Sequence, residues 1–88
     1  PLQQASVFHH RFMATFPFTD LSGKVGRLLM NILIMRAGYL PAVLRYEDRH
    51  DYREAIFRAD NEDYLPLVDL VARAVDRTEI MYLLALDA

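Results

Sequence analysis

The chain has 88 residues, so it can form at most one small domain with a thin hydrophobic core. Its formal net charge of −2 gives no electrostatic reason to expect nucleic-acid binding, and the absence of cysteine excludes disulfides and thiolate metal sites. The longest apolar stretch, residues 28–35, is too short to cross a bilayer, so we expect no membrane contact.

No targeting segment is visible, and the chain begins with Pro1 rather than methionine. We therefore expect a fragment of a longer protein. With no targeting signal to read, the default expectation is a soluble protein of the cytoplasm.

The first predicted element is a helix near the N-terminus, in which Ala5, Phe8, Phe12 and Met13 recur at helical spacing. Pro17 ends this helix, because the residue before a proline is disfavoured in the α region. We expect Phe16 to lie in extended or turn geometry, with its ring packed into the core.

The second predicted helix begins near Ser22 or Gly23 and ends at Ala37, with Gly38 as its left-handed C-cap. Its middle is apolar on almost every side, which is typical of a buried helix. The few polar residues near its start share one side of the helix and suggest that this end faces a ligand; they are Lys24, Arg27 and Asn31.

Two further helices are predicted after a connector over residues 39–44. The first is capped by Asp48, with Tyr52, Ala55, Ile56 and Ala59 on one face. The sequence DNED at 60–63 forms a solvated connection, and the last helix is capped near Glu62 or Asp63. Its apolar stripe consists of Leu67, Leu70, Val71, Ala74, Met81, Leu84 and Ala85.

These elements predict a single all-α domain over residues 1–88. So few helices cannot surround so apolar a second helix, and we infer exposed apolar surface on the isolated chain. Either preceding sequence or a second copy of the chain, in a homo-oligomer, would cover it.

The sequence TFPFTDLSGKVGR at 15–27 has the features of a phosphate-binding loop. A Ser22–Gly23 turn at a helix start lets successive backbone N–H groups point at an anion, and Lys24 and Arg27 add positive charge. Asp20 is placed to hold a Mg²⁺ ion that bridges phosphates. The alternative, on these residues alone, is an ordinary helix cap.

Residues 16–27, FPFTDLSGKVGR, resemble the active-site motif of Fic domains, H-P-F-x-[D/E]-G-N-G-R-x-x-R. The resemblance continues upstream through HHRFMATF and downstream through GRLLMNILIMRAGYLPAVL and YREAIFRADNEDYLPLVDLVARAVDRT, so it covers nearly the whole chain. It is greatest to the animal-type Fic adenylyltransferases. It implies a Fic-fold bundle of about four helices around one buried central helix, without the N-terminal helices and the substrate-docking flap of the Fic core.

Resemblance to this family implies transfer of AMP from ATP to a hydroxyl group of a protein. The motif histidine acts as general base, the acidic residue holds Mg²⁺, and the glycine-rich turn and its arginines bind the phosphates. By position, the acidic residue is Asp20. The phosphate-binding positions are those of Ser22, Gly23, Lys24, Gly26 and Arg27.

Three departures from the motif indicate impaired catalysis. Phe16 occupies the histidine position, and a phenyl ring cannot accept a proton; such a base typically contributes about 10²–10⁴-fold. Leu21 replaces a glycine, and Ser22 replaces an asparagine with a shorter polar arm. We expect a chain that retains at most weak binding of ATP with Mg²⁺.

The alternative function is a non-enzymatic structural or protein-interaction module on a Fic scaffold. The sequence does not identify a target protein. His9 and His10 are adjacent and cannot share one helix face, so we expect solvated or partly packed histidines rather than metal ligands.

Overall fold

A computed structural model describes the backbone of residues 1–16 and 20–87, and the side chains of the same residues except 20–22. The described part is helical, with a short 3₁₀ turn and no strand. Its elements are α1 (Leu2–Thr15), α2 (Asp20–Arg36), the 3₁₀ turn η1 (Tyr46–Asp48), α3 (Arg49–Asp60) and α4 (Leu65–Asp87). The all-α bundle predicted from the sequence is confirmed.

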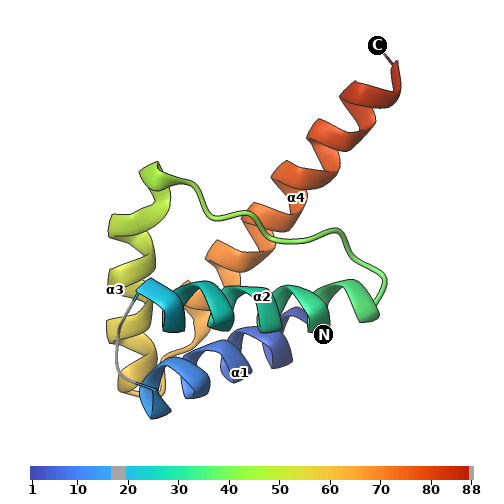
Figure 1. Cartoon of the computed structure of the whole chain (residues 1–88). Helices are drawn as coiled ribbons and strands as arrows, with labels where there is room; N and C mark the ends of the chain where they lie inside the picture. The colour runs from blue at the N-terminus through green and yellow to red at the C-terminus, as the bar shows by residue number, and fades with distance from the viewer. Residues whose placement is uncertain (17–19, 88) are drawn as a thin grey trace.

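Helices α1 and α2 lie side by side and run in opposite directions, α3 crosses one end of the pair, and α4 extends away from the body (Figure 1). Helix α1 packs against both α2 and α4, and α3 packs against α4. The hydrophobic core between them consists of Ala5, Met30, Ile34, Ala42, Tyr52, Ala55, Ala59, Leu67, Leu70, Val71, Ala74 and Val75.

The ends of α1 and α2 lie where local chemistry places them. Phe16 follows α1 in extended geometry, as expected before a proline. Gly38 has φ +96°, and the N–H groups of Gly38 and Tyr39 bond the carbonyls of Met35 and Ile34 in a Schellman arrangement. The N-terminal limit of α2 lies at Asp20, two or three residues before the predicted start.

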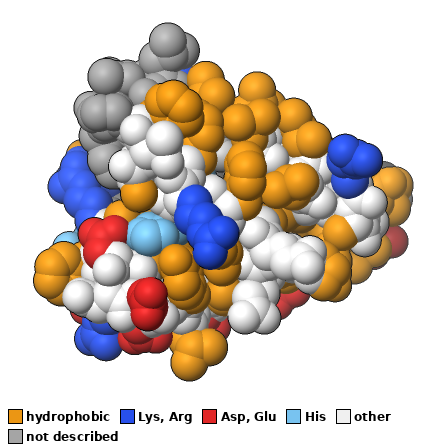
Figure 2. Space-filling model, turned by 90° about the horizontal axis from the view of Figure 1, so that it is seen from below, with side chains coloured by type: hydrophobic (Ala, Val, Ile, Leu, Met, Phe, Trp, Pro, Cys, Tyr) orange, Lys and Arg blue, Asp and Glu red, His pale blue; other side chains and the backbone are white. Residues whose placement is uncertain are grey.

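Helix α2 was predicted to be buried on almost every side, but only part of it is buried. Met30 and Ile34 are fully buried, whereas other apolar side chains of the helix are exposed: Leu28, Ile32, Leu33 and Met35. Helices α1 and α4 each pack against two other helices, whereas α2 packs chiefly against α1. The expected exposed apolar surface is therefore found on α2, because the described chain offers too few elements to cover it; part of the apolar surface is visible in Figure 2.

The stripe predicted for the last helix is buried only in its first half. Leu67, Leu70, Val71 and Ala74 are in the core, but Met81, Leu84 and Ala85 are exposed. The reason is length, since the end of α4 projects beyond the other helices (Figure 1). None of the described helices is both long and apolar enough to span a membrane.

The connection between α3 and α4 differs from the prediction. Glu62 has φ +64° and its N–H bonds the Ala59 carbonyl, while the N–H of Asp63 bonds the Arg58 carbonyl. Glu62 therefore closes the C-terminus of α3 in the left-handed position. It does not cap the N-terminus of α4, which begins at Leu65.

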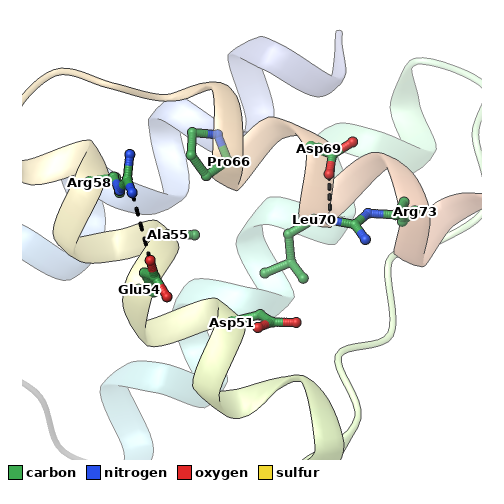
Figure 3. Close-up of a pocket in the computed structure, with 8 residues that line it drawn as sticks. All are labelled: Asp51, Glu54, Ala55, Arg58, Pro66, Asp69, Leu70 and Arg73. Atoms are coloured by element: carbon green, nitrogen blue, oxygen red, sulfur yellow. Dashed lines mark ion pairs between the residues drawn. The ribbon is translucent and has the colours of Figure 1, made fainter.

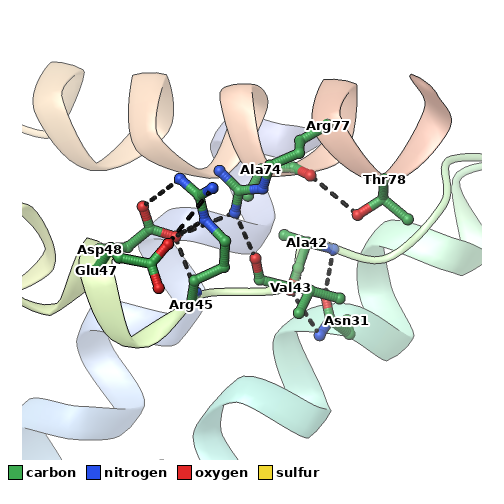
Figure 4. A network of polar contacts seen from close by, with 9 residues as sticks. All are labelled: Asn31, Ala42, Val43, Arg45, Glu47, Asp48, Ala74, Arg77 and Thr78. Atoms are coloured by element: carbon green, nitrogen blue, oxygen red, sulfur yellow. Dashed lines mark hydrogen bonds and ion pairs between the residues drawn. The ribbon is translucent and has the colours of Figure 1, made fainter. Parts of the chain in front are cut away.

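Polar side chains fix the long connector between α2 and α3. Asn31 bonds the backbone N–H and carbonyl of Ala42, at 2.9 and 3.1 Å, and Arg77 donates to the Val43 carbonyl at 2.7 Å (Figure 4). Asn31 was predicted to share a ligand-facing side with Lys24 and Arg27. The structure instead assigns it to holding the connector, since both ends of its amide are engaged there.

Candidate functional site

The N-terminal turns of α2 carry the residues predicted to bind phosphate. The first four N–H groups of a helix have no partner within it, and the helix dipole favours an anion at that end. Gly23 is buried, Lys24 is exposed and Arg27 is partly buried. The backbone of this end is therefore suited to an anion.

Gly23 and Arg27 lie together. A Cβ added at Gly23 would come within 3.2 Å of a guanidinium nitrogen of Arg27. The absence of a side chain at Gly23 thus leaves room for that guanidinium to fold back along the helix, toward its N-terminal turn. This contact gives a structural reason for a glycine four positions before the arginine.

Gly26 does not belong to this surface. A Cβ at Gly26 would lie 2.9 Å from Met13 Sδ and 3.1 Å from Phe12 Cδ1, and it would also meet His9. Gly26 therefore faces α1 and permits the close approach of the two helices. Gly26 has a packing role on the side of α1, and its contact with a nucleotide stays a prediction.

The remaining predicted site residues lie partly outside the described structure. Pro17 and Phe18, and the side chains of Asp20, Leu21 and Ser22, are outside the described residues. Among the described side chains, no group of three His, Asp or Glu residues could hold a metal ion. Asp20 therefore remains to be tested as a Mg²⁺ ligand.

Phe16 is not packed into the core as predicted. Its side chain is half exposed, and its ring contacts that of Phe12 at a centroid distance of 4.8 Å. The position lies just beyond the last turn of α1. Phe16 offers no group that accepts a proton.

The two adjacent histidines are more buried than predicted. His9 is fully buried, and its Nε2 lies 2.6 Å from the hydroxyl of Tyr52 on α3. His10 is also buried, with Nε2 2.7 Å from an Asp60 carboxylate oxygen and Nδ1 3.3 Å from the Tyr64 hydroxyl. Both histidines therefore join α1 to later helices.

Burial determines the protonation of the His9–Tyr52 pair. Burial lowers its pKa below the ordinary 6.5, and burial also raises the pKa of Tyr52 to about 12. Both groups therefore stay neutral near pH 7, and a proton passed from Tyr52 to His9 would move energetically uphill. The pair is structural, and it holds α3 against α1 beneath Arg27.

A cavity of about 200 Å³ lies beside Arg27, between α2 and the start of α3. Its wall includes Arg45, Arg49 and Tyr52, none of which the sequence indicated as a site residue. These residues are separated from Arg27 by 18 to 25 positions, so no local motif could have shown that they meet. The basic residues around the connector were the one available signal.

Curated proteins similar to this chain are described as Protein adenylyltransferase Fic. The protein of Nematostella vectensis is 42% identical over 83 residues, or 94% of this chain. Those of Aedes aegypti and Drosophila yakuba are 38% and 35% identical over 85 residues, or 97% of the chain. No protein-family model matches the chain.

This chain is a Fic-domain relative. The similarity lies in the C-terminal portion of those Fic proteins, and the chain spans 17–19% of their length. The Fic relationship agrees with the all-helical fold and with the motif-like sequence at the start of α2.

Proposed function

We propose that this Fic relative binds the phosphates of a nucleotide at the start of α2 and transfers AMP poorly or not at all. The observation that carries the binding claim is the Gly23–Arg27 geometry, in which a guanidinium folds along the helix end that favours anions. The Fic relationship makes ATP the nucleotide to test. Phe16 carries the claim of impaired transfer.

Magnesium belongs to this proposal through Asp20. A Mg²⁺ ion is usually bound by one or two carboxylates and by phosphate oxygens, and it would neutralise phosphate charge. Asp20 is the first residue of α2, so its backbone lies at the end where the phosphates would bind. Lys24 and Arg27 supply the protein's own positive charge there.

The binding claim predicts a specific loss in the variant Arg27→Gln. Calorimetric titration with ATP and Mg²⁺ should show weak, saturable binding to the parent. Arg27→Gln should weaken it by about tenfold or more, because a charge-assisted hydrogen bond contributes roughly 1.5–3 kcal/mol.

Arg36→Gln is the matched control, since Arg36 is exposed in the last turn of the same helix. It removes the same charge from the far end of α2 and should leave the affinity unchanged. Equal losses in the two variants, or no heat from the parent at millimolar ATP, would contradict the proposed site.

A second candidate function, protein interaction, is favoured by the end of α4. Residues 80–86 place large apolar side chains on all sides of the helix, and those of Ile80, Met81, Leu83, Leu84 and Leu86 are each more than half exposed. Apolar patches of this kind are uncommon on monomers. A second copy of the chain is the partner we propose, because a two-fold pairing sets identical apolar segments together.

Self-association should therefore depend on the apolar end of α4. Sedimentation equilibrium should show the parent as a concentration-dependent dimer and Leu83→Glu as a monomer, since dimerisation would bury the new carboxylate. Leu65→Glu is the control, because Leu65 is exposed at the opposite end of α4. A parent that is monomeric at every concentration would exclude this candidate.

A further inference from the structure

The cavity beside Arg27 concentrates positive charge in an otherwise acidic chain. Three guanidinium groups, those of Arg27, Arg45 and Arg49, and one carboxylate, that of Asp48, line it, which leaves an excess of two positive charges. The whole chain carries a net charge of −2. By comparison, the groove between α3 and α4 in Figure 3 is lined by three carboxylates and two guanidinium groups.

The single carboxylate in the cavity is already engaged. Asp48 accepts hydrogen bonds from the Arg45 backbone N–H at 2.8 Å and from Arg77 Nη2 at 3.0 Å (Figure 4). It also accepts longer bonds, at 3.3 and 3.4 Å, from the guanidinium of Arg45. Because Arg77 approaches from α4, the negative charge of Asp48 is compensated without using Arg27 or Arg49.

Arg49 is held where it can meet a ligand. Its guanidinium carbon lies 3.9 Å from the centroid of the Tyr46 ring, which is a cation–π contact that limits its motion. Within the described part of the chain, Arg49 forms no ion pair with a carboxylate. It is the first residue of α3, so the positive end of that helix dipole faces the same region.

The cavity also has a neutral, ordered wall. Tyr52 is 8% exposed and lines the cavity while its hydroxyl is hydrogen-bonded to His9. A neutral phenol does not repel an anion. A volume of about 200 Å³ holds several water volumes of roughly 30 Å³ each, which is sufficient for a phosphate group and some of its hydration.

We propose that this cavity binds a phosphate group, held by Arg49 and Arg27 beside Arg45, whose guanidinium also pairs with Asp48 and Glu47. The inference rests on the proposed function in that Arg27 borders both the start of α2 and the cavity. The phosphate is either free inorganic phosphate or the terminal phosphate of a nucleotide. These sources share the chemistry that the guanidinium groups recognise.

Titration of the whole chain with inorganic phosphate, followed by amide chemical shifts, tests the cavity directly. We expect saturable shifts at residues that line it. Arg49→Gln should weaken binding by about tenfold, and Arg49→Lys by less, because lysine keeps the charge but loses the planar fork. The control Arg53→Gln removes the same charge from an exposed position one turn along α3 and should bind like the parent.

Addition of ATP to the phosphate-bound chain separates the two sources. Displacement of phosphate by ATP identifies a nucleotide's terminal phosphate as the ligand, and lack of displacement identifies free phosphate; both support the cavity. The proposal is overturned if phosphate causes no shifts there, or if Arg49→Gln and Arg53→Gln bind equally well. ATP binding that depends on Arg27 but not on Arg49 would overturn it and leave the proposed function standing.

Discussion

Replacement of Asp48 by alanine is expected to lower the free energy of unfolding by about 2–4 kcal/mol at pH 7. The Asp48 carboxylate links the start of α3 to the connector and to α4, because it accepts hydrogen bonds from Arg45 at the end of the connector and from Arg77 on α4. Its removal leaves Arg77, which is partly buried, without its carboxylate. Denaturant unfolding followed by circular dichroism measures the loss.

The effect of Asp48 should also depend on pH in a defined direction. Its pKa is held below the ordinary 3.8, chiefly by the hydrogen bond from the Arg45 backbone N–H and also by the guanidinium groups of Arg45 and Arg77. Below 3.8 the unfolded chain therefore binds more protons, and the stabilisation is lost as pH falls further. The difference between parent and Asp48→Ala should be full above about pH 5 and should shrink toward pH 3.

Asp76→Ala is the control for Asp48. Asp76 is exposed on α4, so its removal should change stability by less than about 0.5 kcal/mol. If Asp48→Ala were as stable as Asp76→Ala, the network that holds the connector would contribute nothing. The position of Arg45 beside the cavity would then need another explanation.

Gly26→Leu is expected to destabilise the fold by about 1–3 kcal/mol, or more if the helices cannot separate. The Cβ alone would stand 2.9 Å from Met13 Sδ and 3.1 Å from the Phe12 ring, so a full leucine side chain has no space between α1 and α2. Thermal unfolding followed by circular dichroism measures the loss.

Gly26→Ala separates steric crowding from any special need for glycine. Alanine gains about 1 kcal/mol of helix propensity over glycine, and the Met13 side chain is flexible enough to yield. We therefore expect a small net change for alanine and a large loss for leucine. Equal stability of parent and Gly26→Leu would contradict the assignment of Gly26 to helix packing.

The helix limits that depend on local chemistry could be predicted from the sequence. Pro17 places the end of α1, and Gly38 places the end of α2, because each restricts the backbone at its own position or the one before. The buried face of α3 followed from apolar spacing at Tyr52, Ala55 and Ala59. Such features need no knowledge of what lies across the domain.

Features that depend on distant partners could not be predicted. Asn31 meets Ala42, His9 meets Tyr52 and Asp48 meets Arg77, and the sequence contains no pattern that pairs them. The exposed end of α4 was missed for a related reason. Helical spacing shows which side chains share a face, but not whether another element reaches that face.

The candidate site was predicted in part for the same physical reasons. The motif at the start of α2 indicated Gly23 and Arg27, which the structure places together. It also indicated Gly26, which the structure turns toward α1. Arg45 and Arg49 reach the cavity through the path of the connector, and that path is determined by tertiary hydrogen bonds rather than by local sequence.

The central claim is that the chain binds a nucleotide but lacks the residue that would accept a proton. Its most direct test measures ATP binding and AMP transfer in one preparation. The chain is titrated with ATP and Mg²⁺ by calorimetry, and a portion is incubated with ATP labelled in its AMP moiety together with candidate protein substrates. We predict saturable ATP binding and little or no labelled protein, because Phe16 cannot take the proton of an attacking hydroxyl. Efficient labelling of a protein by the unaltered chain, or no ATP binding at all, would contradict this prediction.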